Sequence, residues 1–156
     1  MAISLTLQQY LDDKHIKYDV LTHDRKMTSS QIAEASHVPG DRLAKAVILS
    51  REGGFVAAVI PASCKVRLDA VGELIDGPIC LSTEDEIEVL FPDCDLGAIP
   101  AVAPAYGLDA IVDERLGQVD DVYFEGGDHC SLIHLSGEQF RQLLNQAPQA
   151  SIAEHA

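Results

Sequence analysis

The segment Leu43-Ala44-Lys45-Ala46-Val47-Ile48-Leu49 predicts a β-strand that is buried on both faces, because apolar residues occupy both alternating positions. A turn at 51–54 and a second apolar run at 55–61 follow, so the two runs predict an antiparallel hairpin. Lys45 is the exception within the first run. Its ammonium group must reach solvent at the strand end, pair with an acid, lose its proton or line a cavity.

Helical and strand-like patterns alternate on both sides of this hairpin. Capping-box patterns at Thr28/Gln31, Thr83/Glu86 and Ser136/Gln139 predict three helix starts. The complete prediction places helices at 6–14, 28–36, 68–75, 84–91 and 137–145, and further strands at 17–21, 79–81, 110–112, 122–124 and 132–135. This order predicts an α+β fold with a mixed sheet of six to seven strands surrounded by helices.

The length and composition indicate one domain. A chain of 156 residues can bury one sizeable core, and we expect the domain to span residues 1–146, with a frayed C-terminal tail at 147–156. No apolar run approaches the length of a membrane-spanning helix, and the N-terminus lacks a basic stretch before an apolar one. The expected compartment is the cytoplasm, with no membrane partner.

The charge is distributed unevenly. Residues 1–67 carry nine of the eleven basic side chains and seven acids, a net charge of +2, whereas residues 68–156 carry two and eighteen, a net charge of −16. A polyanion could approach only the basic surface of the first part, so unaided affinity for nucleic acid should be weak and DNA is not an expected partner. The alternative is that the excess acid only keeps the protein soluble.

The four cysteines, Cys64, Cys80, Cys94 and Cys130, are too widely spaced for a zinc knuckle. We expect buried, reduced thiols, no metal and no cofactor.

Two loops carry further candidate residues. The apolar loop containing Gly97 and Pro100 could present backbone amides to a carbonyl or an oxyanion, or it could only brace a sheet edge. The turn Glu125-Gly126-Gly127-Asp128-His129 sets a carboxylate beside a histidine. Because adjacent strand residues point to opposite faces, Asp128 and His129 could act together only if the turn breaks that alternation; the alternative is a surface histidine.

The order of these features resembles the YbaK/prolyl-tRNA synthetase-associated family of aminoacyl-tRNA editing domains. The features are His23 with Thr28 and Ala33, Lys45 in an apolar strand, the 97–100 loop, and Gly127-Asp128-His129 before an apolar strand and a closing helix. The resemblance covers about residues 4–145. It implies a compact α+β domain with a strongly curved mixed sheet.

The resemblance also implies a function, metal-independent hydrolysis of the ester of a mischarged tRNA. The pocket would accept the 3′ end of that tRNA, with a synthetase or an elongation factor as a possible second partner. Lys45, Gly97 and His129 are then the expected catalytic residues. The expected substrate-binding residues are Ala46, Ala98, Ile99, Pro100, Gly127, Asp128, His23 and Thr28.

Two positions depart from the better-known branches of that family. Ala46 follows the lysine where those branches have Asn or Thr, and two residues instead of three separate Gly97 from Pro100. The amino-acid specificity therefore stays open. A catalytically silent module that binds a nucleotide or a protein partner is the alternative, and hydrolysis of a small ester or amide is a third hypothesis.

Overall fold

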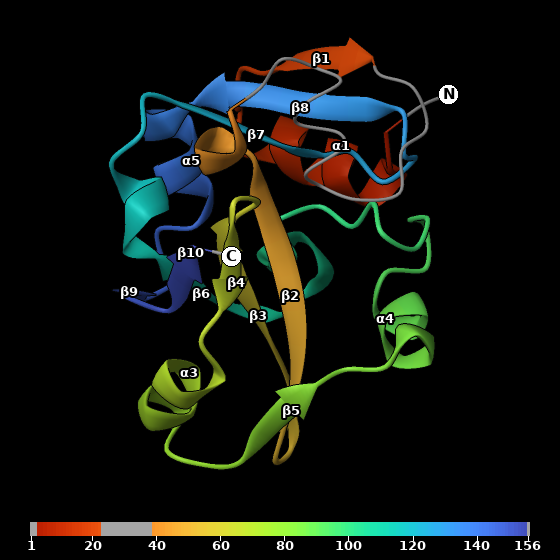
Figure 1. Ribbon diagram of the computed structural model, residues 1–156. Helices are drawn as coiled ribbons and strands as arrows, with labels where there is room; N and C mark the ends of the chain where they lie inside the picture. The colour runs from red at the N-terminus through yellow and green to blue at the C-terminus, as the bar shows by residue number, and fades with distance from the viewer. Residues whose placement is uncertain (1–2, 23–38, 156) are drawn as a thin grey trace.

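The structure is a computed structural model that describes residues 3–22 and 39–155 of the chain (Figure 1). The predicted helix at 28–36 and the candidate residues His23 and Thr28 lie outside the described residues.

A five-stranded mixed sheet runs through the middle of the molecule. It consists of β2 (Ala44–Arg51), β3 (Gly54–Pro61), β5 (Ile79–Leu81), β6 (Asp109–Asp113) and β9 (Gln149–Ala150), in the order β5-β2-β3-β6-β9. The predicted hairpin is confirmed, because β2 and β3 pair antiparallel with Lys45 opposite Ile60. Strand β5 also pairs antiparallel with β2, whereas β6 runs parallel to β3 and β9 runs parallel to β6.

A second sheet lies across one end of the first. It contains β1 (Asp19–Thr22), β7 (Asp121–Glu125) and β8 (Ser131–Ser136), antiparallel in the order β1-β8-β7. A single bridge between Leu43 and Tyr123 joins the two sheets. Helices α1 (Leu5–Asp13) and α5 (Gly137–Leu143) lie on the inner side of this second sheet (Figure 1).

Two short strands lie between residues 149 and 155, so the prediction of a frayed tail is wrong for this segment. β10 (Ala153–His155) pairs antiparallel with β4 (Cys64–Val66) in a third, two-stranded sheet. The backbone amides of Ile152 and Ala153 donate to the buried Asp113 carboxylate at 3.0 and 3.1 Å. Ile152 is fully buried, and its burial together with the Asp113 bonds offsets the entropy that keeps most termini mobile.

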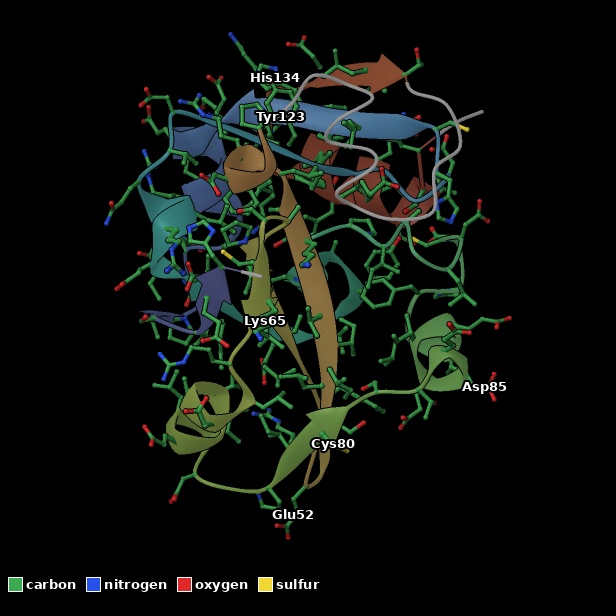
Figure 2. All side chains as sticks on the ribbon, in the orientation of Figure 1. Glu52, Lys65, Cys80, Asp85, Tyr123 and His134 are labelled. Carbon is green, nitrogen blue, oxygen red and sulfur yellow. The ribbon has the colours of Figure 1, made fainter. Side chains whose placement is uncertain are left out.

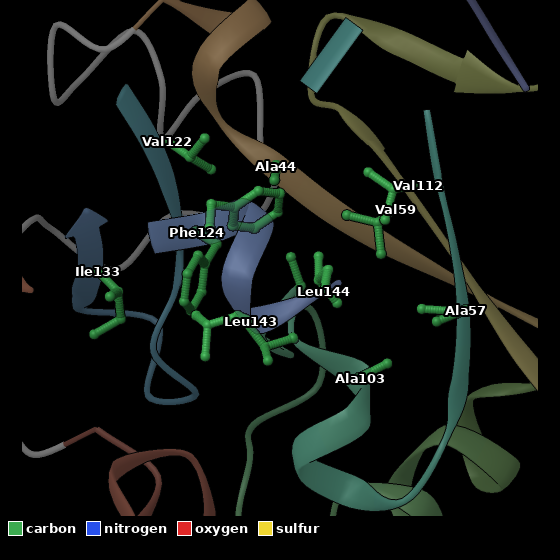
Figure 3. Packing of buried hydrophobic residues seen from close by; sticks show 14 of the residues in the cluster. Ala44, Ala57, Val59, Ala103, Val112, Val122, Phe124, Ile133, Leu143 and Leu144 are labelled. Atoms are coloured by element: carbon green, nitrogen blue, oxygen red, sulfur yellow. The ribbon is translucent and has the colours of Figure 1, made fainter. Parts of the chain in front are cut away.

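The α+β class is confirmed, with ten strands among the described residues divided over three sheets. The main core lies between the two larger sheets and α5, where Phe124 packs beside Val122, Ile133 and Leu143 (Figure 3). A second core lies on the opposite face of the central sheet and includes Leu49. Strand β2 is therefore covered on both faces, as its composition predicts.

The connection between β3 and β6 contains two helices that occupy different positions. Helix α3 (Leu68–Ile75) buries Val71 in the second core. Helix α4 (Glu84–Leu90) begins at the predicted capping box, in which the Thr83 hydroxyl accepts from the Glu86 amide at 3.2 Å. No residue of α4 is fully buried, and the helix stands at the side of the molecule beyond the edge of β2 (Figure 1). Short 3-10 helices at Gly40–Arg42, Ala103–Tyr106 and Glu114–Gly117 complete the described elements.

Candidate functional site

A cavity of about 310 Å³ lies between the first half of β2, helix α4 and the loop that contains Gly97 and Pro100, called the glycine loop below. Four of the predicted site residues line it, namely Lys45, Ala46, Gly97 and Ile99. The remaining lining residues are Leu43, Ala44, Glu84, Ile87, Leu96 and Glu125. The fold thus brings together residues that are about fifty positions apart in sequence.

The Lys45 side chain is half-buried in the wall of this cavity. Desolvation by burial lowers the pKa of its ammonium group, and the neighbouring Cys64 opposes that shift. Within the described residues, Lys45 forms no ion pair and no side-chain hydrogen bond. Of the alternatives open to it, lining a cavity is the one that these contacts favour.

Among the described residues, no strand pairs with the edge of β2 at Ala46, and this part of β2 lines the cavity. The Ala62 amide donates to the Leu43 carbonyl at 2.7 Å, which sets the phase of pairing with β3. Because hydrogen-bonded pairs alternate along an antiparallel ladder, Lys45 bonds to β3 whereas the N–H and C=O of Ala46 point away from it. The Ser82 amide donates to the Ile48 carbonyl at 3.0 Å on the side of β2 away from β3. Because Ile48 is two residues from Ala46, the backbone groups of Ala46 point to that same side.

The glycine loop forms the opposite wall. Gly97 has φ +83°, a left-handed conformation that favours glycine, and a Cβ there would lie 3.1 Å from Cε1 of His129. The loop therefore needs glycine for its backbone conformation and for this close approach. Ala98 and Pro100 are buried and do not line the cavity, and the Ala98 amide bonds to the Asp95 carbonyl at 3.1 Å.

His129 lies behind the glycine loop and does not line the cavity. Its side chain is buried, and Nε2 donates to the Leu96 carbonyl. Nδ1 is buried and accepts no hydrogen bond from the described residues. The sequence left a surface position open as an alternative, and the burial of His129 excludes it. Its contacts give His129 a positioning role for the loop.

Asp128 and Gly127 build the turn that holds His129. The Asp128 carboxylate accepts from the amides of Cys130 and Ser131 at 2.9 and 2.8 Å and from the Ser131 hydroxyl at 3.0 Å. Both of its oxygens are thus engaged within the turn. Gly127 has φ +105°, and a Cβ there would lie 3.0 Å from that of Ser4. Neither residue lines the cavity.

A polar cluster braces the start of the loop from behind. The Tyr106 hydroxyl donates to Asp93 at 2.6 Å and lies 3.1 Å from Sγ of Cys94. Burial raises the pKa of the Cys94 thiol to about 11, so this thiol is protonated at neutral pH and is a poor nucleophile. Burial also raises the pKa of Asp93, but hydrogen bonds from Tyr106 and Thr6 outweigh this effect and lower it overall.

Two acids in the cavity wall were not among the predicted site residues. Glu125 ends β7 and is 6% exposed, whereas Glu84 is an exposed residue in the first turn of α4. The sequence contained one usable signal, because Glu125 directly precedes the Gly126-Gly127 turn. Only the tertiary structure places α4 against β2, so Glu84 carried no such signal.

A further histidine and the four cysteines lie outside the cavity wall. His134 lies on the outer face of the second sheet, stacked on Tyr123 with ring centroids 4.6 Å apart (Figure 2). All four cysteines are free, but only Cys64 is fully buried and Cys80 is exposed, so the prediction of buried thiols is wrong for Cys80. The described residues contain no group of three or more His, Cys, Asp or Glu side chains that could hold a metal ion.

The chain belongs to the aminoacyl-tRNA editing domain family, whose sequence profile matches residues 23–143. This membership supports a role in aminoacyl-tRNA editing, and it confirms the resemblance inferred from the order of the motifs. A comparison with curated protein sequences gave no match.

Several solved structures share the fold. The hypothetical protein APE2540 is 22% identical, with a TM-score of 0.84, and the match covers 96% of this chain and 99% of that one. A candidate trans-editing enzyme for prolyl tRNA synthetase is also 22% identical, with a TM-score of 0.80 and coverage of 96% and 95%. A candidate signal transduction protein from Marinobacter aquaeolei VT8, 21% identical with a TM-score of 0.76, is matched over 96% of this chain but only 30% of its own length. At these identities the similarity establishes the fold alone.

No helix among the described residues is long and apolar enough to cross a membrane.

Proposed function

We propose that this protein is a free-standing deacylase that hydrolyses the ester of a mischarged tRNA in the cytoplasm. The observation that carries the proposal is Lys45, a half-buried lysine that lines a cavity together with Gly97, in a chain of the editing-domain family. The cavity, at about 310 Å³, is at the small end of ligand sites. It fits an aminoacyl group and part of the attached ribose better than a whole nucleotide.

The reaction requires little from the protein because an aminoacyl ester is already activated. A water oxygen bonds to the ester carbon, the bond from that carbon to the ribose oxygen breaks, and the proton of the water passes to the ribose oxygen. Lys45 supplies positive charge for the oxygen that becomes negative in the transition state, and the loop at Gly97 positions the carbonyl. This route uses no metal and no covalent enzyme intermediate.

The size of the cavity also suggests how the substrate is selected. Ala46, Ile87 and Ile99 are partly buried and supply apolar surface to the wall. A small apolar side chain on the substrate fits such a surface, whereas a large one meets the wall, and editing sites use this kind of sieve. We therefore propose a small amino acid wrongly attached to tRNA as the substrate.

The acidic charge of the second part of the chain suggests that a protein partner helps to hold the tRNA. The part of the chain after residue 67 has a net charge of −16 and repels a polyanion. We propose that a synthetase or an elongation factor holds the tRNA while the 3′ end enters the cavity.

The test is deacylation of a panel of mischarged tRNAs by the wild type, Lys45→Ala and Lys65→Ala. Lys65 is a matched control because its side chain is 65% exposed on β4 and pairs with Glu154 away from the cavity (Figure 2). We expect Lys45→Ala to lose about 100-fold or more in rate and Lys65→Ala to keep its rate. Full activity in Lys45→Ala would refute the role of Lys45, and a wild type inactive on every substrate would refute the deacylase.

The second candidate is a silent nucleotide- or partner-binding module of the same fold. Ala46 favours it, because the side-chain hydrogen bond available in members with Asn or Thr is absent here. The test is thermal unfolding in the presence of adenosine or of aminoacyl-adenosine amides. Stabilisation without turnover would favour the module, whereas turnover would exclude it.

A further inference from the structure

At Ala46, the edge of β2 that faces away from β3 carries one hydrogen-bond donor and one acceptor, and a ligand with a matching acceptor and donor can pair with both. The N–H and C=O of Ala46 both point away from β3, as the bonds at Leu43 and Ile48 on either side require. The neighbouring segment contacts this edge of β2 from Ile48 onward, where the Ser82 amide bonds to the Ile48 carbonyl, and the bridge to Tyr123 lies at Leu43. Within the described residues, Ala46 lies between these two contacts, has no strand paired to this edge and lines the cavity.

One amino-acid residue is the natural partner for such a pair of groups. In an antiparallel ladder, a hydrogen-bonded partner residue donates its N–H to the opposite C=O and accepts from the opposite N–H. An aminoacyl ester contains the same three elements, a nitrogen donor, an α-carbon and a carbonyl acceptor. A nucleotide base or a sugar does not reproduce this N–Cα–C=O spacing.

We propose that the aminoacyl group binds as a one-residue β-strand opposite Ala46, an inference that rests on the proposed function. The substrate nitrogen donates to the Ala46 carbonyl, and the ester carbonyl accepts from the Ala46 amide. This arrangement holds the ester carbonyl between β2 and the loop at Gly97, in the cavity that Lys45 also lines.

The same geometry assigns a role to the side chain at position 46. Directly opposed residues in an antiparallel pair project to the same face, with Cβ atoms about 5 Å apart. The substrate side chain therefore lies beside the Ala46 methyl group, on the face of β2 that also carries Ala44 and Ile48. Ile87 and Ile99 line the cavity and pack against the same core. Residue 46 thus helps to set the largest side chain that the site accepts.

Substrate chirality is a second consequence. An L-residue in this pairing directs its side chain toward Ile87 and Ile99, whereas a D-residue directs it to the other face of β2. We expect the enzyme to prefer L-aminoacyl esters.

The first experiment replaces the amide of residue 46 by an ester, with lactic acid in place of Ala46. This change removes the N–H of residue 46. The N–H groups that bond β2 to β3 belong to other residues and stay in place. The matched control is the same replacement at Leu49, whose amide bonds to β3 by the same alternation and whose preceding carbonyl, that of Ile48, bonds to the Ser82 amide. We expect about a fivefold loss of deacylation at 46 with little change in melting temperature, and the reverse at 49. Equal rates for the two proteins, corrected for folded fraction, would overturn the pairing.

The second experiment varies the residue and the substrate together. Ala46→Val should lower the rate on tRNA carrying a larger aminoacyl group more than on tRNA carrying alanine. Propionyl-tRNA, which lacks the α-nitrogen, should be accelerated less by the wild type, relative to its own spontaneous hydrolysis, than alanyl-tRNA is. If Ala46→Val slows both aminoacyl substrates equally and the enzyme accelerates the propionyl ester as much as the alanyl ester, the inference is wrong.

A binding measurement separates this inference from the proposed function. The probe is 3′-deoxy-3′-(L-alanylamino)adenosine, an amide that cannot turn over as an ester does, added to ¹⁵N-labelled protein. The pairing predicts a downfield shift and slower hydrogen exchange of the Ala46 amide, with the Val47 amide less affected. This result would support the pairing even if the protein hydrolysed no tRNA ester, and an unmoved Ala46 amide in an active enzyme would refute the pairing alone.

Discussion

The two halves of strand β2 have the same partner on one side and different surroundings on the other. Both halves pair with β3 along the whole hairpin. The half from Leu49 to Arg51 also pairs with β5, so its second edge is closed, whereas the part from Ala44 to Ala46 lines the cavity. Where the edge of β2 opposite β3 is paired with another strand, the strand serves only the fold. Where that edge is open, its backbone groups can bind a ligand.

Two glycines, one beside each half of β2, give the test with the largest expected effect. Gly97 lies in the cavity wall next to the open half, and Gly53 lies in the hairpin turn that follows the closed half. The two glycines have nearly the same φ, +83° and +84°, but a Cβ at Gly97 meets His129 whereas one at Gly53 meets nothing within 4 Å. Both Gly→Ala variants should therefore lose a similar 1–2 kcal/mol or so of stability from the backbone conformation. Only Gly97→Ala should also displace the cavity wall, with a loss of deacylation of about 10- to 100-fold.

Urea unfolding and single-turnover deacylation measure the two effects separately. A Gly53→Ala variant as impaired in catalysis as Gly97→Ala would show that the open half has no special role.

The two histidines offer a smaller effect in the same comparison. His129→Ala removes the hydrogen bond to the Leu96 carbonyl behind the cavity, so we expect about a fivefold loss of rate. His134→Ala removes contacts with Asp19 and Asp121 on the outer face of the second sheet and should leave the rate unchanged. His129→Asn keeps a side-chain donor and should recover part of the rate. If His129→Ala keeps the wild-type rate, the loop does not depend on His129.

Helix capping tests whether α4 matters as a cavity wall. Thr83 caps α4 and Ser136 caps α5, with hydroxyl to amide distances of 3.2 and 3.1 Å. Either Ala variant should cost about 1 kcal/mol of unfolding free energy. Thr83→Ala alone should also lower the rate, about two- to threefold, because α4 supplies Ile87 and Glu84 to the cavity. The comparison fails if the Ser136→Ala variant loses as much activity at equal folded fraction.

The smallest expected effect is a pH dependence of stability. Burial lowers the pKa of Lys45 below its usual value of 10.5, so between the two values the unfolded chain binds the proton and the folded protein does not. Stability must then rise with pH through that window, just below and up to pH 10.5, because the unfolded state binds more protons. Lys45→Met should remove this rise, and Lys65→Met controls for the loss of a charge. Urea unfolding between pH 8 and 10.5 measures the slope, and an unchanged slope in Lys45→Met would contradict the desolvation of Lys45.

Local patterns in the sequence were sufficient for the elements. The hairpin, the capping box at Thr83 and the helix at 68–75 follow from interactions within fewer than about twenty residues, and the structure confirms each of them. The tail was predicted wrongly, because its order depends on Asp113, about forty residues away. The division of the strands among three sheets was equally beyond local reasoning, since only a single bridge at Leu43 joins the two larger ones.

The candidate site shows the same limit. The sequence marked Lys45 as an anomaly and Gly97 as a loop glycine, and their facing positions in one cavity remained a hypothesis until the fold was known. Ala98, Pro100 and Asp128 were predicted to bind substrate, but they are buried or engaged in turns and do not line the cavity, so their direct contact with substrate remains a prediction without geometric support.

By itself, the sequence determined that β2 has an apolar pattern on both faces and that Lys45 is the exception within it, because alternation along a strand is a property of the chain alone. Only the tertiary structure decided that the edge of β2 stays open at Ala46, that Glu84 and Glu125 join the wall and that His129 lies behind the loop. The open edge of β2 and the walls of the cavity depend on which distant segments pack side by side. Hydrophobic burial drives this packing, but it is non-directional, so no local pattern in the sequence specifies the partners.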